Sequence, residues 1–456
     1  MDLPIAYKNE MKKILKNENE FAKFMECYKK PSYRGIIVNM LKIDEEKFKE
    51  TFGYKIKKSK FALNSYYLED DVDSIGNFAL HHAGAFYVQE PSASSAVTVL
   101  DPKPGEKILD LCAAPGGKST QIAICLNGEG LLWSNEIIHK RAQILISNVE
   151  RMGIRNAVVS SSYPELLCQK LTGFFDKVLI DAPCSGEGMF RKNPEAIKEW
   201  SIEHVKMCAT RQLSILNSAA KAIRENGIMV YSTCTFSLKE NEGNVCAFLK
   251  ENPDFELENI NFDFGRAAER LNSEENFFET SRCRRIFPQD GGEGHFVAKF
   301  RRKSANSKKV KDFNYKKSKT ADNKVAYNYF SELFNCEIYG KIEKISDGFI
   351  ILPDGLPDIS GINVLRAGVQ FAKIKGSMLE PAHAVFMAAK MEELKSKIDF
   401  SVDSKEILAY LKGEEILVSE KLSGYVGVCV NGLTVGYAKA VNGRLKNKYP
   451  KGLRLF

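Results

Sequence analysis

The chain has 456 residues, of which 44% are hydrophobic and 27% are charged, and it carries a net charge of +8. Its length predicts about three domains, and its composition excludes collagen-like, coiled-coil and wholly disordered classes. No stretch approaches the roughly 18 uncharged apolar residues of a membrane span, and the first residues lack the apolar core of a signal peptide. We therefore expect a cytoplasmic protein that makes no membrane contact.

The 11 cysteines are an odd number and show no paired CxxC spacing. Most of them lie in apolar runs, as reduced buried thiols do. The sequence therefore predicts neither a disulfide framework nor a zinc ribbon, and we assign no metal site.

The first 75 residues predict a small α+β unit. We expect a charged amphipathic helix near residues 6–28, a strand at 35–39 and a further helix at 44–53. No catalytic group of side chains is evident in this unit.

Apolar runs alternate with helical stretches from residue 76 to residue 300. The runs are rich in Val, Ile and Leu without strict alternation, which is typical of buried parallel strands; they read KILDLCA, GLLWSNE, AVVSSS, DKVLIDA and GIMVYSTC. The intervening stretches include STQIAICL, IIHKRAQILISNVERMG and EHVKMCATRQLSILNSAAKAIREN. This alternation predicts a doubly wound, Rossmann-like α/β sheet, whose ligands sit at the carboxyl ends of the strands.

A glycine loop, DLCAAPGGKSTQIA, follows the first of these strands and opens a helix. Small residues there let the backbone approach a ligand, and the helix N-terminus offers free N–H groups to a carboxylate or phosphate. The loop lacks the GxxxxGK[ST] spacing of an ATPase phosphate loop. A nucleotide or an adenosyl compound fits, although a structural tight turn would also explain two glycines.

Glu136 ends the next strand, about twenty residues further on. A carboxylate in this place can accept hydrogen bonds from ribose hydroxyls. It can also cap the helix that follows, because an acid in the first turn is favourable. The two roles are compatible.

Two cysteines differ from the others because each directly follows a strand. Cys184 stands in DAPCSGEG and Cys234 in STCTFS, both among small, polar, turn-forming residues. If the two strands are neighbours, both thiols project into the crevice of the glycine loop. Generic burial is the alternative for any cysteine, but a thiolate with a depressed pKa is an effective nucleophile.

Residues 301–325 predict a basic linker. Its first twenty residues carry nine basic side chains against the single acid Asp312 and offer little apolar surface to bury. Like charges keep such a run extended. A solvated hinge and a phosphate-contacting arm are both consistent with it.

Residues 326–456 predict a β-rich domain. Asn431-Gly432 between two apolar runs indicates a hairpin. The end of the chain is basic and carries two interleaved aromatic residues; the residues concerned are Arg444, Lys446, Lys448, Tyr449, Lys451, Arg454 and Phe456.

The order of the motifs VQEPSAS, DLCAAPGGKST, NE, DAPCSGEGMFRK and STCTFSLKENE resembles the S-adenosylmethionine-dependent RNA cytosine-5 methyltransferases of the Nol/Nop/Sun family. The linker and the C-terminal domain are similar to its bacterial RsmF-like branch, which modifies small-subunit ribosomal RNA. The resemblance implies an RNA-facing unit at 1–75, a methyltransferase domain at 76–300 and a PUA-like RNA-binding domain at 326–456. It also implies a protein, expected to be monomeric, that acts on 16S rRNA or the small ribosomal subunit.

The resemblance assigns roles to individual residues. Cys234 would attack carbon 6 of cytosine, so that carbon 5 becomes nucleophilic enough to take the methyl group. Cys184 would assist release, and Asp181 would bond the base near ring nitrogen 3, with Lys118 in the same crevice. Contacts to S-adenosylmethionine would come from Cys112, Ala113, Ala114, Pro115, Gly116, Gly117, Lys118, Glu136, Tyr163 and Asp181.

The chain departs from the family in two places. An acid commonly follows the third strand and bonds the adenine amino group, but this chain reads Ser160-Ser161-Ser162-Tyr163. Tyr163 could flank the adenine, or a serine could substitute for the acid. His295 stands where an aromatic residue is usual, and we interpret it as a packing residue.

Rival functions remain at this point. A DNA cytosine-5 methyltransferase would take its nucleophile from Cys184, but no target-recognition insert interrupts the fold. A tRNA cytosine-5 methyltransferase would share every motif. A non-catalytic RNA-binding assembly factor would need neither of the two cysteines nor Asp181.

Overall fold

The computed structural model describes residues 2–270, 278–304, 323–419 and 421–455. Most of the basic linker predicted at 301–325 falls on residues 305–322 and so lies outside the described residues, as does Phe456. Within the described ranges, no helix is both long enough and apolar enough to cross a bilayer.

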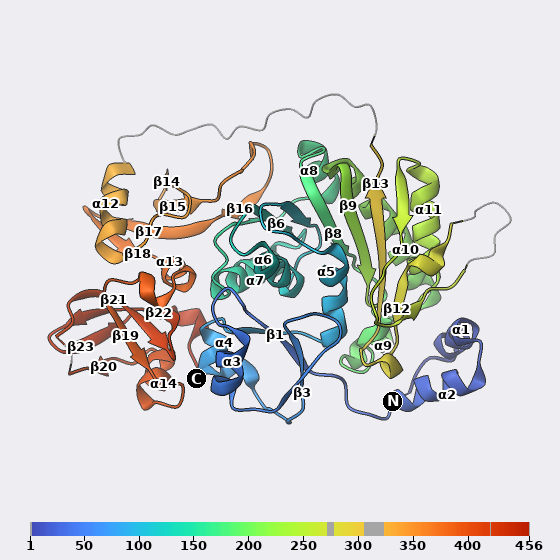
Figure 1. The fold of residues 1–456 in the computed structure, drawn as a ribbon, viewed down its shortest axis with the longest axis horizontal. Helices are drawn as coiled ribbons and strands as arrows, with labels where there is room; N and C mark the ends of the chain where they lie inside the picture. Colours follow the sequence, from blue (N-terminus) through green and yellow to red (C-terminus); the bar gives the residue numbers. More distant parts are fainter. Residues whose placement is uncertain (1, 271–277, 305–322, 420, 456) are drawn as a thin grey trace.

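A ten-stranded sheet forms the centre of the molecule (Figure 1). Five neighbouring parallel strands follow the order β9-β8-β5-β6-β7 and coincide with the five predicted apolar runs. Their bounds are β5 (Lys107–Asp110), β6 (Leu131–Asn135), β7 (Ala157–Ser160), β8 (Phe175–Asp181) and β9 (Ile223–Thr233). The expectation of a doubly wound α/β sheet is confirmed.

Antiparallel strands extend this sheet at both edges. Beyond β9 lie β10 (Phe255–Glu258), β11 (Arg266–Ala267), β12 (Arg284–Ile286) and β13 (His295–Arg302). At the opposite edge β16 (Val364–Ala367), from the chain after the linker, pairs with β7.

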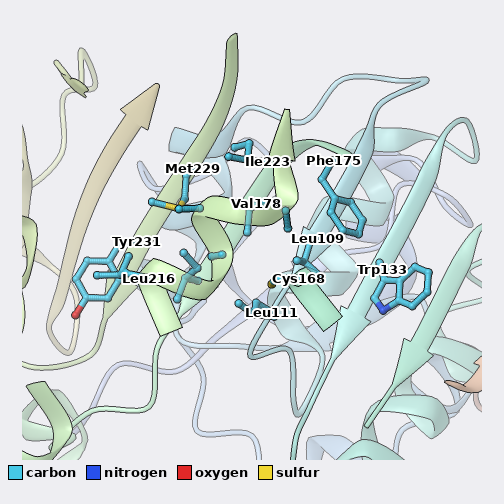
Figure 2. Close-up of a cluster of buried hydrophobic side chains, with 14 of the residues drawn as sticks. Leu109, Leu111, Trp133, Cys168, Phe175, Val178, Leu216, Ile223, Met229 and Tyr231 are labelled. Atoms are coloured by element: carbon cyan, nitrogen blue, oxygen red, sulfur yellow. The ribbon is translucent and has the colours of Figure 1, made fainter. Parts of the chain in front are cut away.

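Helices cover both faces because alternate strand residues point in opposite directions. Leu109 packs with the helices of one face and Ile108 with those of the other. The first face carries α8 (Pro164–Lys170), α10 (Ile202–Ala222) and α11 (Asn244–Glu251), and Figure 2 shows part of its core. The other carries α5 (Ser95–Leu100), α6 (Gly117–Leu126) and α7 (His139–Arg151); α9 (Pro194–Glu199) follows β8.

One predicted helix is too long. The helix expected at residues 203–226 is α10, and it ends at Ala222. The chain leaves the helix there because Ile223 is buried and pairs with Phe175 as the first residue of β9.

A four-stranded sheet and four helices precede the central sheet. They are α1 (Ile5–Leu15), α2 (Glu18–Cys27), β1 (Gly35–Val38), α3 (Glu45–Phe52), β2 (Ile56–Lys58), β3 (Ser65–Leu68), α4 (Ala79–His82) and β4 (Phe86–Val88). The single helix expected at 6–28 is wrong. Lys16 takes a left-handed conformation, and the Asn17 side chain caps α2 by accepting from the amides of Asn19 and Glu20.

Two further sheets follow the linker. The first contains β14 (Lys341–Ile345), β15 (Gly348–Leu352), β17 (Val369–Lys375) and β18 (Met378–Pro381), with α12 (Asn323–Leu333) and α13 (His383–Ala388). The second contains β19 (Lys397–Phe400), β20 (Ile416–Leu417), β21 (Gly424–Val430), β22 (Leu433–Val441) and β23 (Arg444–Asn447), with α14 (Lys405–Lys412). The hairpin at Asn431-Gly432 is confirmed, and both residues have positive φ as a type I′ turn requires. The domain boundaries at 75, 300 and 325 stay predictions.

The two ends of the chain share one hydrophobic core, and the elements after the linker lie beside α3 and α4 (Figure 1). Phe48 and Phe86 of the N-terminal part belong to the same buried cluster as Val428 and Tyr449. A hydrogen bond of 2.6 Å between His82 Nδ1 and the Tyr449 hydroxyl crosses the contact. The last domain is therefore packed against the first.

Candidate active site

The two predicted cysteines meet at the carboxyl edge of the sheet. β8 and β9 are parallel neighbours in which Asp181 pairs with Ser232, so the segments after them leave the sheet side by side. The Cys184 and Cys234 sulfurs lie 3.3 Å apart, within hydrogen-bonding distance, and both residues are half-buried.

A buried acid that the sequence analysis missed ties the two cysteine loops together. The Ser185 amide donates to Glu240 Oε2 at 3.0 Å, and the Ser185 and Thr235 hydroxyls bond each other at 2.8 Å. Gln212 also donates to Glu240 at 2.8 Å. Ser185 directly follows Cys184, and Thr235 directly follows Cys234. The hydrogen bonds between Glu240, Ser185 and Thr235 therefore hold the two cysteine loops together.

The hydrogen bond with Cys234 and burial raise the pKa of Cys184 well above its ordinary value. Cys184 therefore keeps its proton near neutral pH and can donate its S–H to the Cys234 sulfur.

A half-buried ion pair lies beside the thiols. Lys118 Nζ is 2.6 Å from Asp181 Oδ2, and Ser232 donates to Asp181 Oδ1 at 2.7 Å. Burial alone would raise the pKa of Asp181, but Lys118 brings it below the ordinary value. Burial alone would lower the pKa of Lys118, but Asp181 outweighs that effect and raises it. Both groups therefore stay charged.

A cavity of about 710 Å³ opens next to these groups. Seven predicted site residues border it: Cys112, Ala114, Glu136, Tyr163, Asp181, Cys184 and Cys234. Ala113, Pro115, Gly116, Gly117 and Lys118 do not border it. A Cβ at Gly117 would lie 2.0 Å from Gln89 Oε1, so a side chain there would displace the end of Gln89.

Glu136 lies between the start of α7 and the cavity. Its carboxylate accepts the Ile138 amide at 2.9 Å and lies 3.2 Å from Arg141 Nη1. It is only 4% exposed, yet it forms part of the cavity wall.

The serines at the end of β7 are occupied by packing and hydrogen bonds within the protein. Ser160 Oγ accepts from Trp133 Nε1 at 2.9 Å and donates to Asn135 Oδ1 at 2.7 Å. Ser162 is 97% buried. Tyr163, by contrast, is 70% exposed and borders the cavity.

His295 is buried at the start of β13. Its Nδ1 lies 3.0 Å from the Ser92 hydroxyl, which itself donates to Glu90. Burial lowers the pKa of His295 to about 4, so the ring is neutral at pH 7.

Three family models match the chain. Residues 97–301 match the 16S rRNA methyltransferase RsmB/F family, residues 3–91 match the N-terminal domain of 16S rRNA methyltransferase RsmF, and residues 397–455 match the methyltransferase RsmF PUA domain. The last of these ranges contains β19 to β23 and α14.

Curated relatives are similar over almost the whole chain. The ribosomal RNA small subunit methyltransferase F of Vibrio campbellii is 33% identical over 99% of this chain and 97% of its own length. The protein of that name from Escherichia coli is 30% identical over 99% of this chain and 96% of its own length.

Solved structures share the fold. A methyltransferase homologue from Pyrococcus horikoshii has a TM-score of 0.57 and 27% identity over 65% of this chain and 94% of that one. NSun6 from the same organism, solved with SFG, has a TM-score of 0.58 and 23% identity over 66% of this chain and 99% of that one.

These matches cover both ends and the centre of the chain, and each falls on elements already described. The sheet is a Rossmann-like methyltransferase sheet, the cofactor is S-adenosylmethionine, and the last domain is an RNA-binding PUA domain. The chain belongs to the S-adenosylmethionine-dependent 16S rRNA methyltransferases of the RsmB/F family.

Proposed function

We propose that the protein is an RNA (cytosine-5)-methyltransferase that acts as a monomer in the cytoplasm on 16S rRNA. The observation that carries this proposal is the pair of thiols 3.3 Å apart beside the Lys118–Asp181 ion pair. Carbon 5 of cytosine is not nucleophilic by itself, so its methylation needs a group that first adds to the ring. Methylation of a nitrogen or a hydroxyl would need neither thiol.

The cavity residues fit S-adenosylmethionine. A volume of about 710 Å³ suits a ligand of this size, and Glu136 offers a carboxylate at the end of β6, where ribose hydroxyls are bound in such sheets. We assign binding to the residues of the predicted set that border the cavity: Cys112, Ala114, Glu136, Tyr163 and Asp181. When bound, the cofactor supplies an electrophilic methyl group on its sulfonium.

Cys234 is the nucleophile in this proposal. Its thiolate adds to carbon 6 of the cytosine, and the ring electrons move toward carbon 5, which then takes the methyl group. The ionised Asp181 accepts a hydrogen bond from the cytosine amino group, next to nitrogen 3, and the Lys118 ammonium beside it stabilises the negative charge that develops on the ring.

Cys184 acts in release. A water molecule takes the carbon 5 proton, the electrons of that C–H bond form the double bond between carbons 5 and 6, and the bond from carbon 6 to sulfur breaks with its electron pair leaving on the Cys234 sulfur as thiolate. Because its raised pKa keeps Cys184 protonated, its S–H can donate a hydrogen bond to the departing Cys234 sulfur. A leaving thiolate is stabilised by such a donor.

The PUA domain and the N-terminal unit supply RNA affinity. Arg444, Lys446 and Lys451 are exposed at the end of the chain, whereas Lys448 pairs with Glu380. Exposed cations of this kind neutralise phosphates and release counterions.

The function is tested with labelled S-adenosylmethionine and three substrates: unmodified 16S rRNA, tRNA and double-stranded DNA. We expect label in 16S rRNA alone, and nucleoside mass spectrometry of the product should find it in 5-methylcytidine. Incorporation into tRNA or DNA, or into another nucleoside, would contradict the proposal.

Glu136→Ala should weaken cofactor binding by about tenfold, because a charge-assisted hydrogen bond to ribose is worth about 1.5 kcal/mol or more. Calorimetry with S-adenosylhomocysteine measures the effect. Glu129→Ala, an exposed acid in the turn before β6, is the matched control and should bind as wild type does. Equal affinities of the Glu136 variant and wild type would remove Glu136 from the cofactor site.

A further inference from the structure

The cofactor edge of the sheet is completed by the chain after the linker. β16 pairs with β7 through Val364 opposite Ser160 and Ala367 opposite Val158 (Figure 1). Ile362 and Ala367 also lie in the buried cluster that contains Trp133. This short segment is therefore part of the methyltransferase core, although more than sixty positions separate it from the end of β13 at Arg302.

Asn363, directly before β16, makes three hydrogen bonds to two consecutive serines. Its carbonyl accepts the Ser161 amide at 2.9 Å, and its side-chain Nδ2 donates to the Ser161 carbonyl at 2.9 Å. Its own amide donates to Ser162 Oγ at 3.1 Å. One residue thus holds the backbone of this turn from the outside.

Asn135 holds the same turn from the cavity side. Its Oδ1 accepts the Ser162 amide at 3.1 Å, and its Nδ2 donates to the Ser162 carbonyl at 3.0 Å. Its carbonyl accepts the Ala113 amide of the glycine loop at 2.9 Å. The backbone of Ser161 and Ser162 is therefore held between Asn135, which lines the cavity, and Asn363, which follows the linker.

The next two residues, Tyr163 and Pro164, are part of the cavity wall, and Pro164 begins α8. Their direction depends on the turn before them, because no side chain can keep a fixed position on a backbone that moves. If the cavity wall is already fixed before the ligand binds, less conformational entropy is lost on binding.

We propose that Asn363 is a positioning residue of the cofactor site, which sets the wall formed by Tyr163 and Pro164 against the adenosyl half of S-adenosylmethionine. The proposal rests on the cofactor placement given under the proposed function. It makes the segment after the linker a component of cofactor binding as well as a connection to the RNA-binding domain.

Asn363→Ala tests this in the full-length protein, because it removes the Nδ2 donor and leaves both backbone bonds in place. Calorimetry should show S-adenosylhomocysteine binding about tenfold weaker. Methylthioadenosine, which carries only the adenosyl half, should lose affinity by the same factor. In steady-state assays the KM for S-adenosylmethionine should rise, while kcat at saturating cofactor and the KM for RNA stay within about twofold of wild type.

Arg366→Ala is the matched control. Arg366 lies on β16 and pairs with Glu150 on α7 at 3.6 Å, away from the clamped turn, so this variant should bind the cofactor as wild type does. Asn363→Asp is the second variant. It places a carboxylate against the Ser161 carbonyl, so this variant should bind S-adenosylhomocysteine more weakly than Asn363→Ala does.

Three results would overturn the inference: wild-type affinity in Asn363→Ala, an equal loss in Arg366→Ala, or a loss confined to kcat. If Asn363→Ala fails to fold, Ser162→Ala removes the hydroxyl that accepts the Asn363 amide and must weaken both ligands. Wild-type protein that binds neither ligand would refute the cofactor placement itself, and the inference with it. Wild-type methylation with unchanged binding in the variants would refute the inference alone.

Discussion

Replacing Cys234 with alanine should abolish methyl transfer, with a loss of at least about a thousandfold, because the proposal assigns the addition to carbon 6 to Cys234 and leaves Cys184 as a proton-bearing donor. The covalent complex between protein and RNA should vanish as well. Cys184→Ala should behave differently, since addition precedes release. Its complex should form and persist when RNA and S-adenosylmethionine are supplied.

A denaturing gel detects the covalent complex as a slowly migrating protein–RNA band. The band should be absent for Cys234→Ala and should accumulate for Cys184→Ala. Cys125→Ala, a half-buried thiol on α6, is the control and should turn over normally. The opposite pattern would move the nucleophile to Cys184. Loss of a buried thiol can cost about 1 kcal/mol of stability, so melting temperatures must accompany the gel.

Arg285→Ala should lower the free energy of unfolding of the central domain by about 3–5 kcal/mol, the cost of leaving a buried charge without its partner. Arg285 is 2% exposed and binds the fully buried Glu242 through two nitrogens, with Nε 2.7 Å from Oε1. Its Nη1 also donates to the Phe236 carbonyl at 2.8 Å, in the loop after Cys234. Activity should therefore fall together with stability.

Urea unfolding followed by tryptophan fluorescence measures this effect, because both tryptophans, Trp133 and Trp200, lie in the central domain. Lys198→Ala removes an exposed ion pair with Glu195 three residues away and should change the free energy by no more than about 0.5 kcal/mol. The double variant Arg285→Met with Glu242→Leu should be more stable than Arg285→Ala. Equal unfolding midpoints for wild type and Arg285→Ala would show that the pair contributes nothing.

The parts that the sequence predicted are those with a local signal. Parallel strands are buried on both faces, so β5 to β9 appear as apolar runs, and Cys184 and Cys234 were recognisable because turn-forming residues follow each strand. The hairpin at Asn431-Gly432 was recognisable for the same reason, since its conformation favours those two residues.

The parts that were missed depend on partners far away in the chain. β16 has only four residues and no pattern of its own, and its place in the sheet follows from pairing with β7 about two hundred positions earlier. Glu240 and Glu242 stand in the run KENE, which has the composition of a solvated surface. Both are fully buried, because Ser185 and Arg285 come to them from elsewhere. Burial of this kind leaves no periodic signal in a single sequence.

The core shared by the two ends of the chain affects which surfaces are exposed while the chain is being synthesised. Phe48 and Phe86 leave the ribosome early, but the strands that cover them, β19 and β21 to β23, are translated last. The apolar face of the first unit therefore stays uncovered during most of the synthesis of the chain. A product that terminates before residue 397 keeps that face permanently exposed and presents it to chaperones and proteases. The surface that the first unit exposes is therefore concealed only after β19 and β21 to β23 have been made.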